Sequence, residues 1–213
     1  MEAKACIFDM DDTLVASAAI WKIAEHELLA ALGVPWSVEL ASHYKGMNAL
    51  DVAATIHAHL KPQISCVDCQ SIMRNALIRT FMADPIRPMQ GATELVRRLH
   101  GRMPLAIASG SPLSIIEHAT EELGIRSCFD VLLSSESVKR GKPQPDIFLA
   151  AADQLKTPPA DCLVFEDSLI GVQAARAAGM RVVCVPSMNN GDAIQPLADA
   201  VFVSLNEVPQ LLP

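Results

Sequence analysis

The stretch Ile7-Phe8-Asp9-Met10-Asp11-Asp12-Thr13-Leu14 carries the most information about the fold of this chain. The apolar run from Ala5 to Phe8 is typical of a strand buried on both faces of a parallel sheet. The carboxylates of Asp9 and Asp11 follow it directly. A fold tolerates such crowding when a cation lies between the carboxylates or when one of them attacks a substrate. Because ligands bind at the carboxyl ends of strands in open α/β sheets, the stretch predicts metal-assisted carboxylate chemistry.

Length and composition predict an ordered globular protein. The chain has 213 residues, of which 51% are hydrophobic, enough for one good-sized domain or for a core domain with a smaller companion. The formal charge is −7, and lysine and arginine form no run longer than a pair. Binding to nucleic acid is therefore not expected, because a phosphate backbone requires a basic face. A small anionic substrate remains compatible with this charge.

The sequence carries no recognisable targeting segment. The apolar run near the start is short and is interrupted by Asp9, and no run approaches the roughly 18 apolar residues of a membrane helix. Three of the six cysteines, Cys6, Cys162 and Cys184, lie in or beside predicted buried strands, where cysteine acts as a small hydrophobic side chain. These features predict a cytoplasmic protein without disulfides and without membrane contact.

The chain divides into two blocks with different patterns. Residues 16–82 are predicted to be helical throughout, because apolar residues recur at helical spacing. After residue 85 strands alternate with helices, and together with the first strand they are predicted at 5–8, 104–108, 131–134, 162–165, 181–185 and 201–203. This alternation predicts a doubly wound, Rossmann-like α/β fold with a parallel sheet covered on both faces. The helical block is then an insertion after the first strand.

Polar side chains follow the ends of four predicted strands: Asp9 and Asp11, Ser109, Lys142, and Glu166 with Asp167. Because parallel strands end at the same edge of a sheet, these side chains are expected to lie close together. The carboxylates offer hard oxygens, which Mg²⁺ prefers. Ser109 begins a predicted helix, where main-chain amides bind anions, and Lys142 adds a positive charge. Such a set suits phosphoryl transfer, which depends on positioning and charge neutralisation.

Four motifs in this order resemble those of the haloacid dehalogenase superfamily: Asp-X-Asp-X-Thr from Asp9, the strand-end Ser109, the pair Lys142-Pro143, and Glu-Asp-Ser-X-X-Gly from Glu166. The helical insertion resembles the small cap of the subfamily that includes β-phosphoglucomutase and the sugar-phosphate phosphatases, nearest in look to those acting on hexose and 2-deoxyhexose phosphates. The resemblance implies a catalytic core of residues 1–15 and 83–213 and an all-helical cap of residues 16–82.

The resemblance also implies roles for individual residues. Asp9 would be the nucleophile that forms an aspartyl-phosphate. Asp11 would protonate the leaving alcohol and then activate the hydrolytic water. Ser109, the Gly110 amide and Lys142 would bind the transferring phosphoryl group.

A single Mg²⁺ ion is the cofactor that the resemblance implies. It would be held by the Asp9 carboxylate, the Asp11 main-chain carbonyl and Asp167, with Glu166 in or beside the coordination sphere.

Two positions separate a phosphatase from a mutase. Mutases of this subfamily resemble one another in an arginine after a Lys-Gly pair of the cap and in a lysine after the strand-end serines, where this chain has Ala49 and Pro112. Each charged hydrogen bond to a second phosphate is worth roughly 1.5–3 kcal/mol, so their loss favours hydrolysis of a monophosphate. We therefore expect a phosphatase of a small phosphorylated metabolite, a sugar or polyol phosphate. The alternatives are a β-phosphoglucomutase-type phosphosugar mutase and a catalytically silent protein that binds a phosphorylated ligand.

Other positions bear on the cap and its connection to the core. Lys45 and Trp21 are candidates for substrate contact, with a solvated Lys45 and a Trp21 that packs within the cap as alternatives. Asp12 stands where the subfamily commonly has Gly, and Ala16 stands where it often has Asp. Neither change removes a catalytic group. A monomer is expected.

Overall fold

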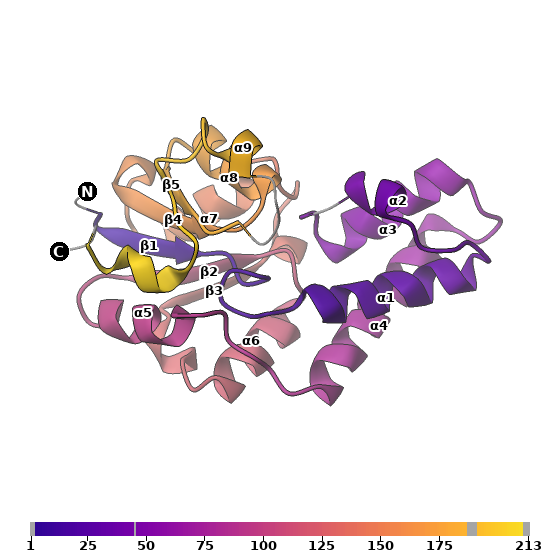
Figure 1. Ribbon diagram of the computed structural model, residues 1–213, viewed down its shortest axis with the longest axis horizontal. Helices are drawn as coiled ribbons and strands as arrows, with labels where there is room; N and C mark the ends of the chain where they lie inside the picture. Colours follow the sequence, from indigo (N-terminus) through magenta and orange to yellow (C-terminus); the bar gives the residue numbers. More distant parts are fainter. Residues whose placement is uncertain (1–2, 45, 187–190, 211–213) are drawn as a thin grey trace.

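The computed structural model describes residues 3–44, 46–186 and 191–210 (Figure 1). Its sheet has six parallel strands in the order β3-β2-β1-β4-β5-β6. Their bounds are β1 Ala5–Phe8, β2 Leu105–Ser109, β3 Val131–Ser134, β4 Cys162–Glu166, β5 Arg181–Cys184 and β6 Ala200–Val201. The chain order reverses at β1, which lies between β2 and β4. In doubly wound sheets this reversal opens a crevice at the carboxyl ends of the strands.

Helices cover both faces of the sheet (Figure 1). One face packs against α5 (Ala92–Leu99) and α6 (Leu113–Glu122), and the other against α7 (Asp146–Gln154), α8 (Leu169–Ala177) and the short α9 (Gly191–Ile194). Short 3₁₀ helices complete this part: η1 Arg126–Cys128, η2 Ser135–Ser137, η3 Pro159–Asp161 and η4 Leu205–Gln210.

The alternation of side chains along β1 explains why the strand is apolar throughout. Cys6 and Phe8 belong to the core on the α5–α6 side, and Ala5 and Ile7 belong to the core on the α7–α8 side. All four are fully buried. A strand with helices on both faces therefore needs an unbroken apolar run, and the first polar residue after it, Asp9, marks where the strand ends.

A helical segment lies beyond the carboxyl ends of the strands, the end towards which the β1 arrow points in Figure 1. It consists of α1 (Ala18–Ala31), α2 (Val38–Ser42), α3 (Ala49–Leu60) and α4 (Cys66–Ala83), with α4 packed against both α1 and α3. No β-strand lies among its described residues. Three of these helices, α2, α3 and α4, have an N-cap residue whose side chain accepts a main-chain hydrogen bond. In α3 the side-chain Oδ1 of Asn48 accepts from the Asp51 amide.

The connection to the helical segment gives Asp12 a structural role. Its backbone is left-handed, with φ of 56°, a conformation in which glycine is common and aspartate is tolerated. Its Oδ1 accepts hydrogen bonds from the amides of Ser17 and Ala18, both at 3.0 Å. The carboxylate therefore satisfies amides at the start of α1, which a glycine could not do. Ala16 leaves its side chain exposed while its amide donates to the carbonyl of Arg87 at 2.9 Å.

The predicted fold class is confirmed, and most predicted elements agree with the structure within two residues at each end. The last strand is shorter than predicted, at Ala200–Val201. The sequence analysis missed α9 and the 3₁₀ helices, which are short. Of the helices among the described residues, none combines the length and the apolar character needed to cross a membrane.

Candidate active site

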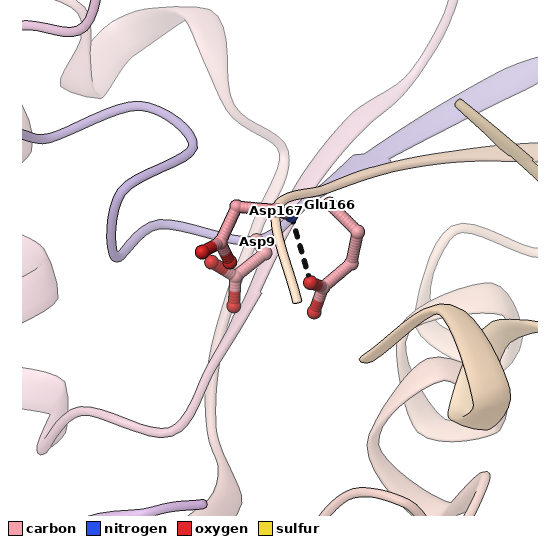
Figure 2. Close-up of side chains that lie close together, drawn as sticks. All are labelled: Asp9, Glu166 and Asp167. Carbon is pink, nitrogen blue, oxygen red and sulfur yellow. Dashed lines mark hydrogen bonds between the residues drawn. The ribbon is translucent and has the colours of Figure 1, made fainter. Parts of the chain in front are cut away.

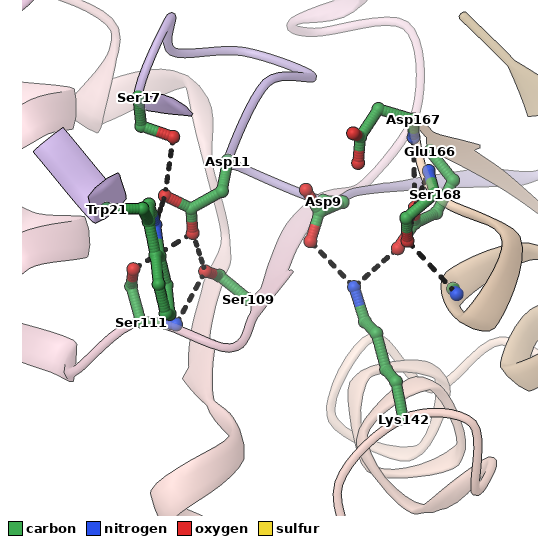
Figure 3. Close-up of polar contacts among 11 residues, drawn as sticks. Asp9, Asp11, Ser17, Trp21, Ser109, Ser111, Lys142, Glu166, Asp167 and Ser168 are labelled. Carbon is green, nitrogen blue, oxygen red and sulfur yellow. Dashed lines mark hydrogen bonds and ion pairs between the residues drawn. The ribbon is translucent and has the colours of Figure 1, made fainter. Parts of the chain in front are cut away.

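The carboxylate–lysine cluster, formed by Asp9, Lys142, Glu166 and Asp167, lies where β1 and β4 end. Lys142, from the loop after η2, places its Nζ 2.6 Å from Asp9 Oδ1 and 2.6 Å from Glu166 Oε1 (Figure 3). All four side chains are buried. Burial alone would lower the pKa of Lys142, but the Asp9 and Glu166 carboxylates outweigh it and raise that pKa. The lysine therefore stays protonated.

Glu166 is held by hydrogen bonds on both carboxylate oxygens. Oε1 accepts from Lys142, and Oε2 accepts from the Asp167 amide, the Ser168 amide and the Ser168 hydroxyl, each at 2.9 Å. Gly171 lies so close that a Cβ there would overlap the Glu166 carboxylate. The Glu-Asp-Ser-X-X-Gly motif thus builds a fixed carboxylate that orients the lysine and the chain at Asp167.

Three carboxylates of the cluster could hold a metal ion. Asp9, Glu166 and Asp167 each offer an oxygen, and these oxygens lie within 4.8 Å of one another (Figure 2). Burial raises the pKa of Asp9 well above its ordinary value, although the Lys142 ammonium opposes the rise. Three buried carboxylates gathered this closely suit a divalent cation with a preference for oxygen. The residues therefore fit Mg²⁺, and Glu166 is the carboxylate whose two oxygens already accept hydrogen bonds from Lys142 and from residues 167 and 168.

The Asp11 cluster, formed by Asp11, Ser17, Trp21, Ser109 and Ser111, lies beside the carboxylate–lysine cluster (Figure 3). Asp11 Oδ1 accepts hydrogen bonds from Ser17 Oγ and Trp21 Nε1, both at 2.8 Å. Its Oδ2 accepts from Ser109 Oγ at 3.0 Å and Ser111 Oγ at 2.9 Å. Four donors from two parts of the chain therefore fix this carboxylate: Ser17 and Trp21 lie at the start of α1, and Ser109 and Ser111 lie at and just after the end of β2.

The helical segment reaches the core next to the carboxylate–lysine cluster. A Cβ on Gly110 would lie 3.1 Å from the Cα of Asn48, and a Cβ on Gly141 would overlap the side chains of Asn48 and Asp51. The two glycines thus let the start of α3 pack closely beside Lys142. A cleft of about 620 Å³ lies between α3 and residues 135–143, and Asn48, Asp51 and Gly141 are among the residues that line it.

The structure brings together most of the residues singled out in the sequence. Asp9, Lys142, Glu166 and Asp167 form one cluster, Asp11, Ser109 and Trp21 join a second, and Gly110 faces the helical segment. Lys45 lies outside the described residues. The Asp11 main-chain carbonyl as a metal ligand stays a prediction.

Sequence reasoning missed Ser17, Ser111, Asn48 and Gly141. A signal existed for Asn48, since Asn three residues before Asp at a helix start is typical of an N-cap. Ser111 belongs to the Ser-Gly-Ser stretch already associated with Ser109. The contacts of Ser17 and Gly141 depend on loop geometry, for which the sequence offers no pattern.

Comparison with known proteins defines the class. Residues 3–179 match the profile of the haloacid dehalogenase-like hydrolase family. The chain is 33% identical over 183 residues to the fructose-1-phosphate phosphatase YqaB of Escherichia coli, covering 84% of this chain and 94% of that protein. It is 34% identical over 205 residues to a bifunctional riboflavin kinase/FMN phosphatase of Arabidopsis thaliana, covering 95% of this chain and 53% of that protein. This chain thus spans about half the length of the Arabidopsis relative.

A solved structure shares the whole fold. The crystal structure of CbbY from Rhodobacter sphaeroides in complex with phosphate superimposes with a TM-score of 0.81 at 26% identity, covering 97% of this chain and 96% of that one. The chain belongs to the haloacid dehalogenase-like hydrolases. The family resemblance predicted from the four motifs is therefore confirmed.

Proposed function

We propose that this protein is a Mg²⁺-dependent phosphatase that hydrolyses a small phosphorylated metabolite, a sugar or polyol phosphate, through an aspartyl-phosphate on Asp9. The observation that carries the proposal is the buried pairing of Asp9 with Lys142, at 2.6 Å, beside the Asp11 cluster at the reversal point of the sheet. The similarity to a fructose-1-phosphate phosphatase along almost its whole length supports this substrate class.

The first step is attack by a carboxylate oxygen of Asp9 on phosphorus. The bond from phosphorus to the ester oxygen breaks, and Asp11 gives its proton to the departing alkoxide. Lys142 offsets the charge of Asp9, which would otherwise repel an anionic substrate. Ser109 and the Gly110 amide bind the phosphoryl oxygens at the start of α6, where main-chain N–H groups favour anions.

The second step returns Asp9 to its starting state. Water attacks phosphorus, Asp11 accepts a proton from that water, and the bond from phosphorus to Asp9 breaks to release inorganic phosphate. Asp11 thus acts once as acid and once as base.

Asp9 and Asp167 would hold the Mg²⁺ ion through their carboxylates and Asp11 through its main-chain carbonyl, with Glu166 beside them. When bound, the ion supplies positive charge to the phosphoryl oxygens during transfer. The burial of these three carboxylates and their closeness to one another support that assignment.

The helical segment of residues 16–82 serves as a cap over a core of residues 1–15 and 83–213. Its contacts through Asn48 to Gly110 and Gly141 support a closed arrangement that shields the site from water. Ala49 and Pro112 carry no charge to hold a second phosphate, so the mutase alternative has less support. Lys45 remains a candidate for substrate contact.

Location and assembly belong to the same proposal. All six cysteines are free thiols, which supports a reducing, cytoplasmic compartment. We propose a monomer that acts on a small metabolite and not on nucleic acid, in keeping with the formal charge of −7.

Phosphate release from p-nitrophenyl phosphate, with and without Mg²⁺, followed by a panel of sugar and polyol monophosphates, tests the proposal. We expect metal-dependent turnover that Asp9→Asn abolishes, because an amide cannot form the acyl phosphate, while the exposed Asp153→Asn serves as control. Near-normal turnover by Asp9→Asn would refute the nucleophile. Glucose 1-phosphate with a bisphosphate activator separates the alternatives, since a mutase yields the 6-phosphate and a phosphatase yields free phosphate.

A further inference from the structure

We infer that Trp21 is a positioning residue for Asp11, acting through its indole N–H, and that this governs protonation of the leaving group. The inference rests on the proposed function. Trp21 Nε1 lies 2.8 Å from Asp11 Oδ1, within hydrogen-bond distance of the group assigned as acid and base (Figure 3). The sequence indicated either substrate contact or packing for Trp21, and neither expectation includes this bond.

The four donors to Asp11 are not chemically equivalent. The indole N–H can only donate, whereas a serine hydroxyl can donate or accept. Oδ1 accepts from Trp21 and from the Ser17 hydroxyl, and because the indole cannot turn to accept, Oδ1 remains an acceptor of at least that bond. Oδ2 is bonded only to the hydroxyls of Ser109 and Ser111, which can turn to accept a proton. Trp21 thus leaves Oδ2, on the side of the strand-end serines, as the oxygen that carries the transferable proton.

Several contacts fix Trp21 relative to Asp11. Trp21 packs against the main hydrophobic core, and its own amide donates to the Ser17 carbonyl at 3.0 Å. The Asp12 carboxylate holds the amides of Ser17 and Ala18. The start of α1 is thereby attached to the loop that bears Asp11, so the indole N–H returns to the same oxygen whenever the segment is in place.

The chain contains a matched control for this hydrogen bond. Trp36, the second of its two tryptophans, donates its indole N–H to Glu25 Oε2 at 2.9 Å within the helical segment. Trp36→Phe therefore removes an indole–carboxylate bond of the same kind without touching Asp11. Comparing it with Trp21→Phe separates the loss of an indole bond in this segment from the loss of the bond to Asp11.

Two esters with different leaving groups test the inference. An alkyl phosphate, the best sugar or polyol phosphate from the panel, needs a proton on its leaving oxygen, whereas p-nitrophenyl phosphate loses a stabilised phenolate that does not. The kcat/KM of each ester reports the transfer of the phosphoryl group to Asp9. We expect Trp21→Phe to lower kcat/KM about 10- to 100-fold for the alkyl ester, below the 10²–10⁴-fold effect of a whole general acid. For the aryl ester we expect a change under about threefold, because leaving-group protonation contributes little there.

The ratio of the two kcat/KM values does not depend on how much of the enzyme is folded, so partial unfolding of the variant cannot mimic the result. Trp36→Phe should leave the ratio at the wild-type value. Equal losses with both esters in Trp21→Phe would overturn the positioning role and assign Trp21 to packing alone. Wild-type protein without Mg²⁺-dependent turnover of either ester would instead overturn the proposed function.

Discussion

Gly171 illustrates how a missing side chain can set the geometry of the carboxylate–lysine cluster. The Glu166 carboxylate occupies the space where a Cβ of residue 171 would lie. That position lets Glu166 accept from Lys142 on one oxygen and from the backbone after β4 on the other. The glycine that ends the motif is thus needed because a side chain there would overlap Glu166. Its backbone is helical and not left-handed, so its conformation does not require glycine.

We predict that Gly171→Ala displaces Glu166 and removes one of the two partners of Lys142. Overpacking of this kind costs about 1–3 kcal/mol of unfolding free energy, and turnover should fall as the lysine loses its orientation. Urea unfolding and p-nitrophenyl phosphate hydrolysis measure the two effects. Gln173→Ala, on the exposed face of the same helix, should stay within about 0.5 kcal/mol of wild type. A Gly171→Ala variant with unchanged stability and turnover would contradict this account.

At this scale the sequence predicted residues better than it predicted their contacts. The sequence alone predicted that Asp9, Lys142 and Asp167 lie close together. Parallel strands end at one edge of the sheet, and polar residues that directly follow buried strands are easy to recognise. The bond from Trp21 to Asp11 could not, because it depends on the left-handed turn at Asp12 and on the exact start of α1.

Among the elements, α4 and η2 are joined across the boundary between helical segment and core. Arg74 of α4 donates two hydrogen bonds to the Glu136 carboxylate of η2, at 2.7 and 3.3 Å. Both side chains are partly exposed, so solvent and salt weaken the pair. A second arginine of α4, Arg79, makes a more exposed pair with Glu27 within the helical segment.

We predict that Arg74→Gln loosens the cap and raises KM up to about fivefold, in keeping with roughly 0.2–1 kcal/mol for an exposed pair. Wild-type KM should also rise with ionic strength, and this dependence should be weaker in the variant. Steady-state kinetics at low and high salt measure both effects. Arg79→Gln removes an ion pair that does not cross the boundary, so it should retain the wild-type salt dependence; an equal loss of that dependence would argue against a role in closure.

Elements were predictable where burial imposed a pattern. The strands are apolar on both faces, and the longer helices carry apolar residues at regular spacing. The end of β6 and the short α9 were not predictable, because elements of two and four residues bury too little to leave a pattern. The contact between the start of α3 and the core residues Gly110 and Gly141 could not be predicted either, because nothing in the sequence indicates which core loops face the inserted helices.

For the molecule as a whole, the buried carboxylates of the carboxylate–lysine cluster predict that stability depends on the proposed metal ion. Asp9, Glu166 and Asp167 are 5%, 1% and 7% exposed, and Lys142 forms ion pairs with Asp9 and Glu166. Without a cation their repulsion destabilises the folded chain, and an ion bound between them removes that repulsion.

We predict that Mg²⁺ raises the melting temperature by about 5–10 °C at a concentration near 100 times its dissociation constant. Differential scanning fluorimetry with EDTA and then with excess Mg²⁺ measures the shift. Asp167→Asn should lose the response to Mg²⁺, because it removes one of the proposed ligands. The exposed Asp153→Asn should keep the full response. A wild-type melting temperature indifferent to Mg²⁺ would argue against a metal site in this cluster.

The place of β1 in the middle of the sheet has a consequence for biosynthesis. β1 pairs with β2, whose matching residues are made about a hundred positions later, and with β4, made later still. A growing chain on the ribosome thus contains this apolar strand, with Asp9 directly after it, long before either neighbouring strand has been made. Asp167 is added only after most of the protein has been translated, so a nascent chain cut short before β4 lacks this carboxylate and carries β1 without one of its two neighbouring strands.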